Sequence, residues 1–198
     1  MLMMTLDEAP QERGGAMKYA LQALLRRRLL LPVIALVGLL LLAGCATAPY
    51  MVHMKRGREF EDAQINLKAE REYREAVRLK PDYAEAHYRL GVVIWAYKRD
   101  EGVVEIREAI RLKPDFTEAH ESLGTCLFLQ NKLEDAEKEY REVVRLRPTH
   151  VWALWWLGHV LDIEGRRKEA RQYWEKALKY TRDPNLSETF KQRLAEPD

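Results

Sequence analysis

Histidine and cysteine are the residue types in this 198-residue chain that could hold a metal ion or act as a nucleophile. His87 and His120 each follow a Glu-Ala pair and occupy equivalent places in two similar segments. A zinc site needs further cysteine, histidine or carboxylate ligands at fixed spacings, and no such cluster surrounds these two residues. We therefore expect two structural histidines, with no metal site and no cofactor. Cys126 is expected to be a buried thiol that packs as a small hydrophobic residue.

The second cysteine, Cys45, ends a pattern typical of exported proteins. Arg26–Arg28 precede an uncharged apolar run over 29–42, and small residues follow it. This order is that of a secretory signal peptide, and the run is shorter than the roughly 20 residues that span a bilayer. The closing Leu42-Ala43-Gly44-Cys45 resembles the lipobox of bacterial lipoproteins.

That resemblance implies that residues 1–44 are removed and that Cys45 becomes the lipidated first residue, with 45–49 as a short tether. An ordinary signal peptide or an uncleaved anchor stays open as an alternative, and so does a start at Met17 instead of Met1.

The charge balance and the missing catalytic motifs narrow the function classes. Removal of residues 1–44 leaves 28 basic and 28 acidic side chains, so no positive excess points to nucleic acid. After Cys45 the chain has no G-x-S-x-G, H-E-x-x-H or glycine-rich phosphate loop. We expect a protein that is not an enzyme.

The elements that position these residues follow an internal repeat. Pro81, Pro114 and Pro148 are 33 and 34 residues apart, and a Leu-Gly pair recurs after each. This pattern resembles the tetratricopeptide repeat (TPR) family, which has a period of about 34 residues. The resemblance implies an all-α solenoid of antiparallel helix pairs, with repeats at 50–83, 84–116, 117–150 and 151–184.

The sequence also predicts where helices begin and where paired helices cross. Asp82 with Glu85, and Asp115 with Glu118, have the spacing of capping boxes, and Thr149 is a candidate cap for the fourth repeat. Residues 185–198 are assigned to a terminal capping helix and tail, and this helix is expected to start at Asp183-Pro184 or Ser187 and to end near Ala195. Small residues are expected where paired helices cross, at Gly91, Gly124 and Gly158 on first helices and at Ala69, Gly102, Ala136 and Ala170 on second helices.

The TPR resemblance also implies a binding surface. In that family the first helix of each repeat lines a concave face, and residues at fixed positions contact the ligand. Carried over to this chain, these positions hold Arg58, Glu61, Tyr88, Val92, Trp95, Glu121, Thr125, Phe128, Trp152, Trp155 and His159. The family's lysine-and-asparagine clamp for a C-terminal carboxylate is replaced by Met54, Arg58, Tyr88 and Val92, so chaperone tails are not the expected ligand.

These features predict a membrane-anchored TPR lipoprotein that acts as a protein–protein interaction scaffold or assembly factor in the bacterial envelope. The expected partners are protein or peptide segments of envelope proteins, and the membrane through lipid on Cys45. Ala46 after Cys45 favours the outer membrane, facing the periplasm, by the sorting known for such lipoproteins.

Type IV pilus biogenesis and the scaffolding of cell-wall enzymes are two pathways that similar lipoproteins serve. The alternatives are an envelope hydrolase or other enzyme with a non-obvious site, and an inner-membrane TPR protein with an uncleaved signal anchor. The partner, the pathway and the oligomeric state stay open.

Overall fold

Helices make up all the regular structure in residues 48–196, the part of the chain that the computed structural model describes. The predicted signal segment 1–44 and the predicted lipidation site Cys45 lie outside the described residues. The helices are α2 (Pro49–Asp62), α3 (Asn66–Leu79), α4 (Ala84–Trp95), α5 (Arg99–Leu112), α6 (Thr117–Leu129), α7 (Leu133–Leu146), α8 (Val151–Ile163), α9 (Arg167–Tyr180) and α10 (Pro184–Ala195).

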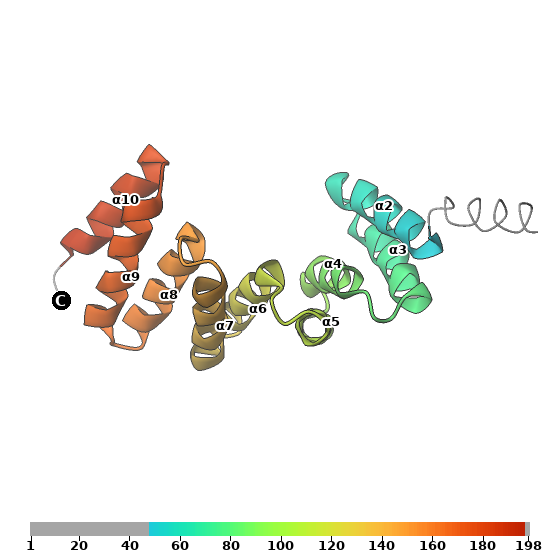
Figure 1. Cartoon of the computed structure of the whole chain (residues 1–198), viewed down its shortest axis with the longest axis horizontal. Coiled ribbons are helices and arrows are strands. Elements are labelled where there is room, and N and C mark those ends of the chain that lie inside the picture. The colour runs from blue at the N-terminus through green and yellow to red at the C-terminus, as the bar shows by residue number, and fades with distance from the viewer. Residues whose placement is uncertain (1–47, 197–198) are drawn as a thin grey trace, which may run out of the picture. The chain divides into compact units, whose positions relative to one another are not determined.

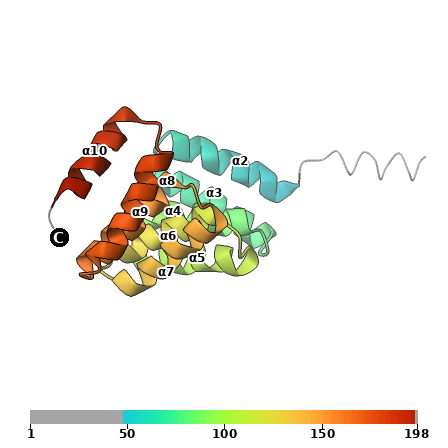
Figure 2. The ribbon, with the colours of Figure 1, turned by 60° about the vertical axis from the view of Figure 1, so that its left-hand side comes forward.

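Consecutive helices pack as pairs, and each pair packs on the next (Figure 1). The first helices α2, α4, α6 and α8 are joined by short turns to the second helices α3, α5, α7 and α9, and α10 lies against α9 (Figure 2). The all-α fold of antiparallel helix pairs predicted from the repeat is confirmed.

Each pair is held by an aromatic or branched side chain of the second helix under a glycine of the first. Tyr73, Ile106, Tyr140 and Trp174 recur at this place and are fully buried. At Gly158 an added Cβ would lie 2.4 Å from Nε1 of Trp174, so the ring needs the space that glycine leaves.

Repeat 2 differs from the others in its turn. The turns after α2, α6 and α8 each contain a residue with left-handed backbone geometry, Gln64, Asn131 or Gly165. The turn from Trp95 to Arg99 has none, and α4 is one residue shorter than α6. Repeat 2 is one residue shorter than the others because it lacks the turn residue with left-handed backbone geometry.

The capping-box prediction is wrong for α4 and α6. Their N-cap residues are Tyr83 and Phe116, and neither makes a side-chain cap hydrogen bond. Asp82 and Asp115 lie one residue too early, because both helices begin at the third residue after the proline. Thr149 likewise lies one residue before the N-cap of α8, which is His150.

The observed side-chain caps belong to other residues. His150 caps α8, where its Nδ1 accepts a hydrogen bond from the Ala153 amide at 3.2 Å. Asp183 caps α10 and accepts the Asn185 amide at 2.8 Å, which places the start of this helix at Pro184.

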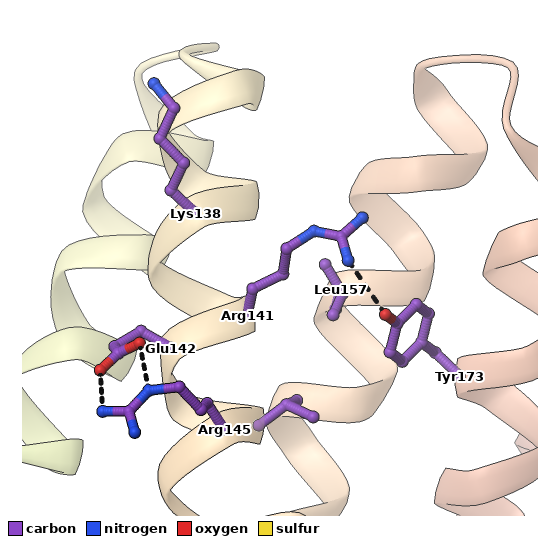
Figure 3. A pocket seen from close by; sticks show the side chains of 7 residues that line it. Lys138, Arg141, Glu142, Arg145, Leu157 and Tyr173 are labelled. Atoms are coloured by element: carbon purple, nitrogen blue, oxygen red, sulfur yellow. Dashed lines mark hydrogen bonds and ion pairs between the residues drawn. The ribbon is translucent and has the colours of Figure 1, made fainter.

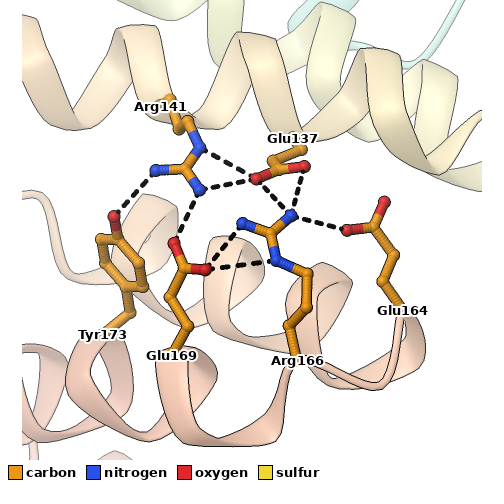
Figure 4. Close-up of polar contacts among 6 residues, drawn as sticks. All are labelled: Glu137, Arg141, Glu164, Arg166, Glu169 and Tyr173. Atoms are coloured by element: carbon orange, nitrogen blue, oxygen red, sulfur yellow. Dashed lines mark hydrogen bonds and ion pairs between the residues drawn. The ribbon is translucent and has the colours of Figure 1, made fainter.

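Ion pairs join consecutive second helices at two of the three repeat junctions. Arg141 of α7 donates to Glu137 at 2.6 Å and, across the junction, to Glu169 of α9 at 2.7 Å (Figure 4). Arg166 donates to the same two carboxylates, as Figure 4 shows.

A similar group of ion pairs, made by other residues, lies at the junction between repeats 1 and 2. Glu70 there accepts from Arg74 and Lys98. Between repeats 2 and 3 the position of the buried glutamate is held by Val103, which packs into the apolar core instead.

Candidate peptide-binding groove

A cavity of about 300 Å³ opens between the first helices of repeats 2 and 3, which contact each other directly. We call it the α4–α6 cavity; it is lined by Val92, Trp95, Glu121, Ser122, Thr125 and Cys126. Four of the groove residues expected from the sequence meet here. Ser122 and Cys126 were not among the expected contacts.

The side chains of this cavity differ in how much solvent they meet. Val92 is 36% exposed, whereas Trp95, Glu121 and Thr125 are half-buried. The Thr125 hydroxyl donates to the Glu121 backbone carbonyl at 3.0 Å, and its oxygen lies 3.2 Å from the Tyr140 hydroxyl. Burial raises the pKa of the Cys126 thiol to about 11, so this cysteine is a neutral part of the wall.

A second group of expected residues forms an aromatic cluster on α6 and α8. Phe128 and Trp155 both pack against His159, with ring centroids 5.7 and 6.4 Å away. Trp155 also stacks on Phe190 of α10 at 4.8 Å, so the terminal helix covers part of it. Trp152, at the start of α8, is 45% exposed.

The remaining expected residues stand apart from the cavity. Arg58 is exposed on α2, and Glu61 accepts a hydrogen bond from the Tyr73 hydroxyl at 2.6 Å. Tyr88 packs on Phe116 with ring centroids 4.9 Å apart and is half-buried. Burial raises the Tyr88 pKa, so its hydroxyl is protonated at neutral pH.

On α6 and α8, two exposed apolar residues were missed by the sequence analysis. Leu129 and Ile163, the last residues of α6 and α8, are 57% and 50% exposed. Both hold the thirteenth position of their repeats, one of the family's contact positions, so the repeat alignment contained the signal that could have identified them.

Two polar atoms among these residues are buried without a hydrogen-bond partner in the described part of the chain. They are Nε1 of Trp95 and Nδ1 of His159. Burial, followed by the positive charge of Arg193, lowers the pKa of His159, so its ring is neutral at pH 7. Both atoms therefore lie beneath the surface that the aromatic side chains form.

His87 and His120 lie in the core and join three pieces of chain. Nδ1 of His87 is 2.7 Å from Glu105 on α5, and Nε2 is 2.9 Å from the Pro81 carbonyl. His120 repeats the arrangement with Glu139 and Pro114 at 2.6 and 3.1 Å. These contacts give both histidines a structural role.

The same pairing recurs in repeat 1, where Nδ1 of His53 is 2.7 Å from Glu72. His53 was not singled out from the sequence, although it holds the position of His87 in its repeat. In residues 48–196 no group of three or more His, Cys, Asp or Glu side chains is placed to hold a metal ion.

A larger cavity, of about 530 Å³, lies on the second-helix side between α7 and α9 (Figure 3). Its charged groups already have partners: Arg145 donates to Glu142, and Arg141 donates to the Tyr173 hydroxyl at 3.1 Å. It therefore offers a ligand fewer free groups than the α4–α6 cavity.

None of the described helices has the length and apolar character needed to cross a bilayer.

Comparison with known proteins places these helix pairs in a family. Models of the tetratricopeptide repeat match residues 68–96, 98–151 and 130–186, which together cover more than half of the chain. No curated protein sequence matches the chain significantly.

Solved structures with the same fold include three TPR-like proteins of low sequence identity. MamA has a TM-score of 0.64 at 21% identity, over 76% of this chain and 85% of its own. YrrB, described as a TPR protein with an unusual peptide-binding site, has a TM-score of 0.63 at 20% identity, over 74% and 76%.

Pseudomonas aeruginosa PilF has a TM-score of 0.63 at 22% identity, over 73% of this chain and 69% of its own. At these identities the likeness concerns the fold alone. The repeat models and the helix pairs they match show that the chain belongs to the tetratricopeptide repeat family.

Proposed function

We propose that this protein is an interaction module whose first helices bind an extended or helical segment of another protein. The observation that carries the proposal is the apolar surface of α4, α6 and α8. It combines a cavity of about 300 Å³ with exposed Val92 and Trp152. Aromatic side chains offer large contact area with little loss of rotamer freedom, which suits them to binding hot spots.

The peptide-binding site described for YrrB, a protein of the same fold, supports this kind of ligand. A segment laid along the first helices would bury the exposed side chains of Val92 and Trp152.

We further propose that the module is held at a bacterial envelope membrane through lipid on Cys45, with the outer membrane facing the periplasm as its site. The sequence order of arginines, apolar run and Leu-Ala-Gly-Cys supports this placement. Only three residues separate Cys45 from Pro49, where α2 begins, and they reach about 10 Å when extended. The helices would therefore act close to the membrane surface, where they recruit envelope proteins such as pilus or cell-wall assembly factors.

Partner capture from envelope extracts tests the groove, with variants of the full chain compared on the same bait. Trp152→Ala combined with Val92→Asn is expected to lower the affinity for each captured protein about tenfold or more, since single hot spots contribute about 2 kcal/mol. The matched control is Val104→Asn, which changes an exposed valine of the second helix α5 in the same way.

The control variant should bind as the unchanged chain does. Equal binding by all three proteins, with unchanged far-UV circular dichroism, would reject the first helices as the binding surface.

A further inference from the structure

Glu121 is a single carboxylate on an aromatic surface. It lies at the repeat position that Tyr88 holds in repeat 2 and Trp155 holds in repeat 4. Its side chain lines the α4–α6 cavity beside Val92 and Trp95 and keeps 31% of its surface exposed. A carboxylate placed between apolar walls favours a positively charged group, because the low local dielectric strengthens their attraction.

Several acidic residues on the first helices already have an arginine partner, and Glu121 does not. Glu85 accepts from Arg89 at 2.8 Å, and Glu118 accepts from Arg147 at 2.7 Å. On α8, Asp162 likewise accepts from Arg167 at 2.8 Å. Within residues 48–196, no lysine or arginine lies within ion-pair distance of Glu121.

Its nearest basic group is Nε2 of His150, at 3.5 Å. Nδ1 of that ring accepts the Ala153 amide, so Nε2 is the nitrogen that can donate to Glu121. Within residues 48–196 Glu121 therefore faces a histidine and no lysine or arginine.

The walls of the cavity suit the stem of a long basic side chain. Val92 and Trp95 supply apolar surface, along which lysine and arginine bury their methylene groups while the charged end stays polar. The Arg99 guanidinium already lies 5.8 Å from the Trp95 ring centroid, so a second cation is held by the Glu121 carboxylate and not by that ring.

We propose that the bound partner segment is basic, and that one of its lysine or arginine side chains enters the α4–α6 cavity and pairs with Glu121. The inference rests on the proposed binding function of the first helices and names the chemistry of the ligand.

A random peptide library displayed on phage and selected on the full chain tests this inference. Selected peptides are expected to be enriched in lysine and arginine. Glu121→Gln keeps the side-chain shape and removes the charge, so it should abolish the enrichment and weaken binding of the selected peptides about tenfold or more. Glu121→Lys should select acidic residues at the same peptide position.

Glu134→Gln is the matched control, because Glu134 is an exposed glutamate of the second helix α7 with no ion pair. It should select the same peptides as the unchanged chain. Peptides without basic residues, or a basic enrichment that survives Glu121→Gln, would overturn the inference and leave the groove in place. Failure to select any peptide, or selection unaffected by Trp152→Ala with Val92→Asn, would instead overturn the proposed binding function.

Discussion

At the scale of single residues, the neighbours of His87 and His120 favour the protonated form of each ring. A carboxylate oxygen and a backbone carbonyl both accept hydrogen bonds, so each ring meets two acceptors and binds them best with both nitrogens protonated. Burial lowers the pKa of His87, but Glu105 and the Pro81 carbonyl outweigh it and leave the pKa above the usual histidine value. For His120 the Glu139 hydrogen bond is the largest cause of the same rise in pKa.

The raised pKa values predict how stability depends on pH. Because the folded pKa lies above the unfolded value of about 6.5, the contribution is complete below that pH and is lost as pH rises through the folded value. Urea unfolding between pH 6 and pH 9 should show a falling free energy of unfolding. The double variant His87→Gln, His120→Gln should be about 1–3 kcal/mol less stable per site at pH 6 and should lose most of this slope. An equal slope in both proteins would contradict the charged pairs.

Gly102 is a second residue whose role depends on its neighbours. Glycine within a helix costs about 1 kcal/mol relative to alanine, so propensity alone predicts that Gly102→Ala stabilises α5. The structure predicts the reverse, because the added Cβ would lie 2.8 Å from the Trp95 Cα and 2.9 Å from the Gly91 carbonyl oxygen. Backbone atoms cannot rotate away, so we expect a net loss of about 1–3 kcal/mol in thermal or urea unfolding.

Gly165→Asn serves as the comparison for that experiment. Gly165 has a left-handed backbone and open space around it, and Asn131 holds the equivalent turn position with the same geometry. Its substitution should change stability by only a few tenths of a kcal/mol. A Gly102→Ala variant as stable as this one would show that α4 and α5 can separate without loss.

At the scale of elements, the first and last repeats differ in their outer residues. In repeat 1, Arg56 is exposed at the position that Leu90, Leu123 and Leu157 hold in the later repeats. At the other end α10 supplies Phe190, which is 1% exposed and packs with Leu154 and Ala177.

Phe190→Ala should therefore release the last helix. Loss of a buried phenylalanine costs about 3–5 kcal/mol, and helices of repeat arrays depend chiefly on their nearest neighbours. Hydrogen exchange should speed up in α10 and α9 while α2 and α3 keep their protection. Thr189→Ala, an exposed change on the same helix, should leave exchange unaltered. Uniformly faster exchange along all helices would instead indicate one cooperative unit.

At the scale of the whole molecule, the proposed lipid anchor decides where the binding surface acts. The chain after residue 44 has balanced formal charge, so attraction to an anionic bilayer would not by itself hold it there. Several acyl chains, at about 0.8 kcal/mol per buried CH₂, would.

Cys45→Ser should therefore shift the protein from the membrane to the soluble fraction, while the unchanged chain stays membrane-bound after a high-salt wash. Mass spectrometry of the purified protein should find Cys45 as a lipid-modified N-terminus. A mature chain that retains residues before Cys45 would favour the uncleaved-anchor alternative.

The sequence alone determined the repeat architecture, because Pro81, Pro114 and Pro148 recur with the Leu-Gly pairs at nearly constant spacing. Regular spacing of this kind reflects the local geometry of turns and helix crossings, which each copy of a repeat must satisfy. The same reasoning misplaced the caps at Asp82 and Asp115, since the first helical residue depends on how the turn after proline closes.

Only the tertiary structure decided which aromatic residues stay accessible. Trp152 and Trp155 lie three residues apart on α8, yet the first is 45% exposed whereas the second is half-buried against Phe190 of α10. The surroundings of Glu121 are a similar case, because the absence of a lysine or arginine beside it within residues 48–196 follows from the positions of basic residues on other helices. Repeat spacing identifies the face on which a side chain lies, but its exposure and its charge partners depend on contacts between helices distant in the sequence.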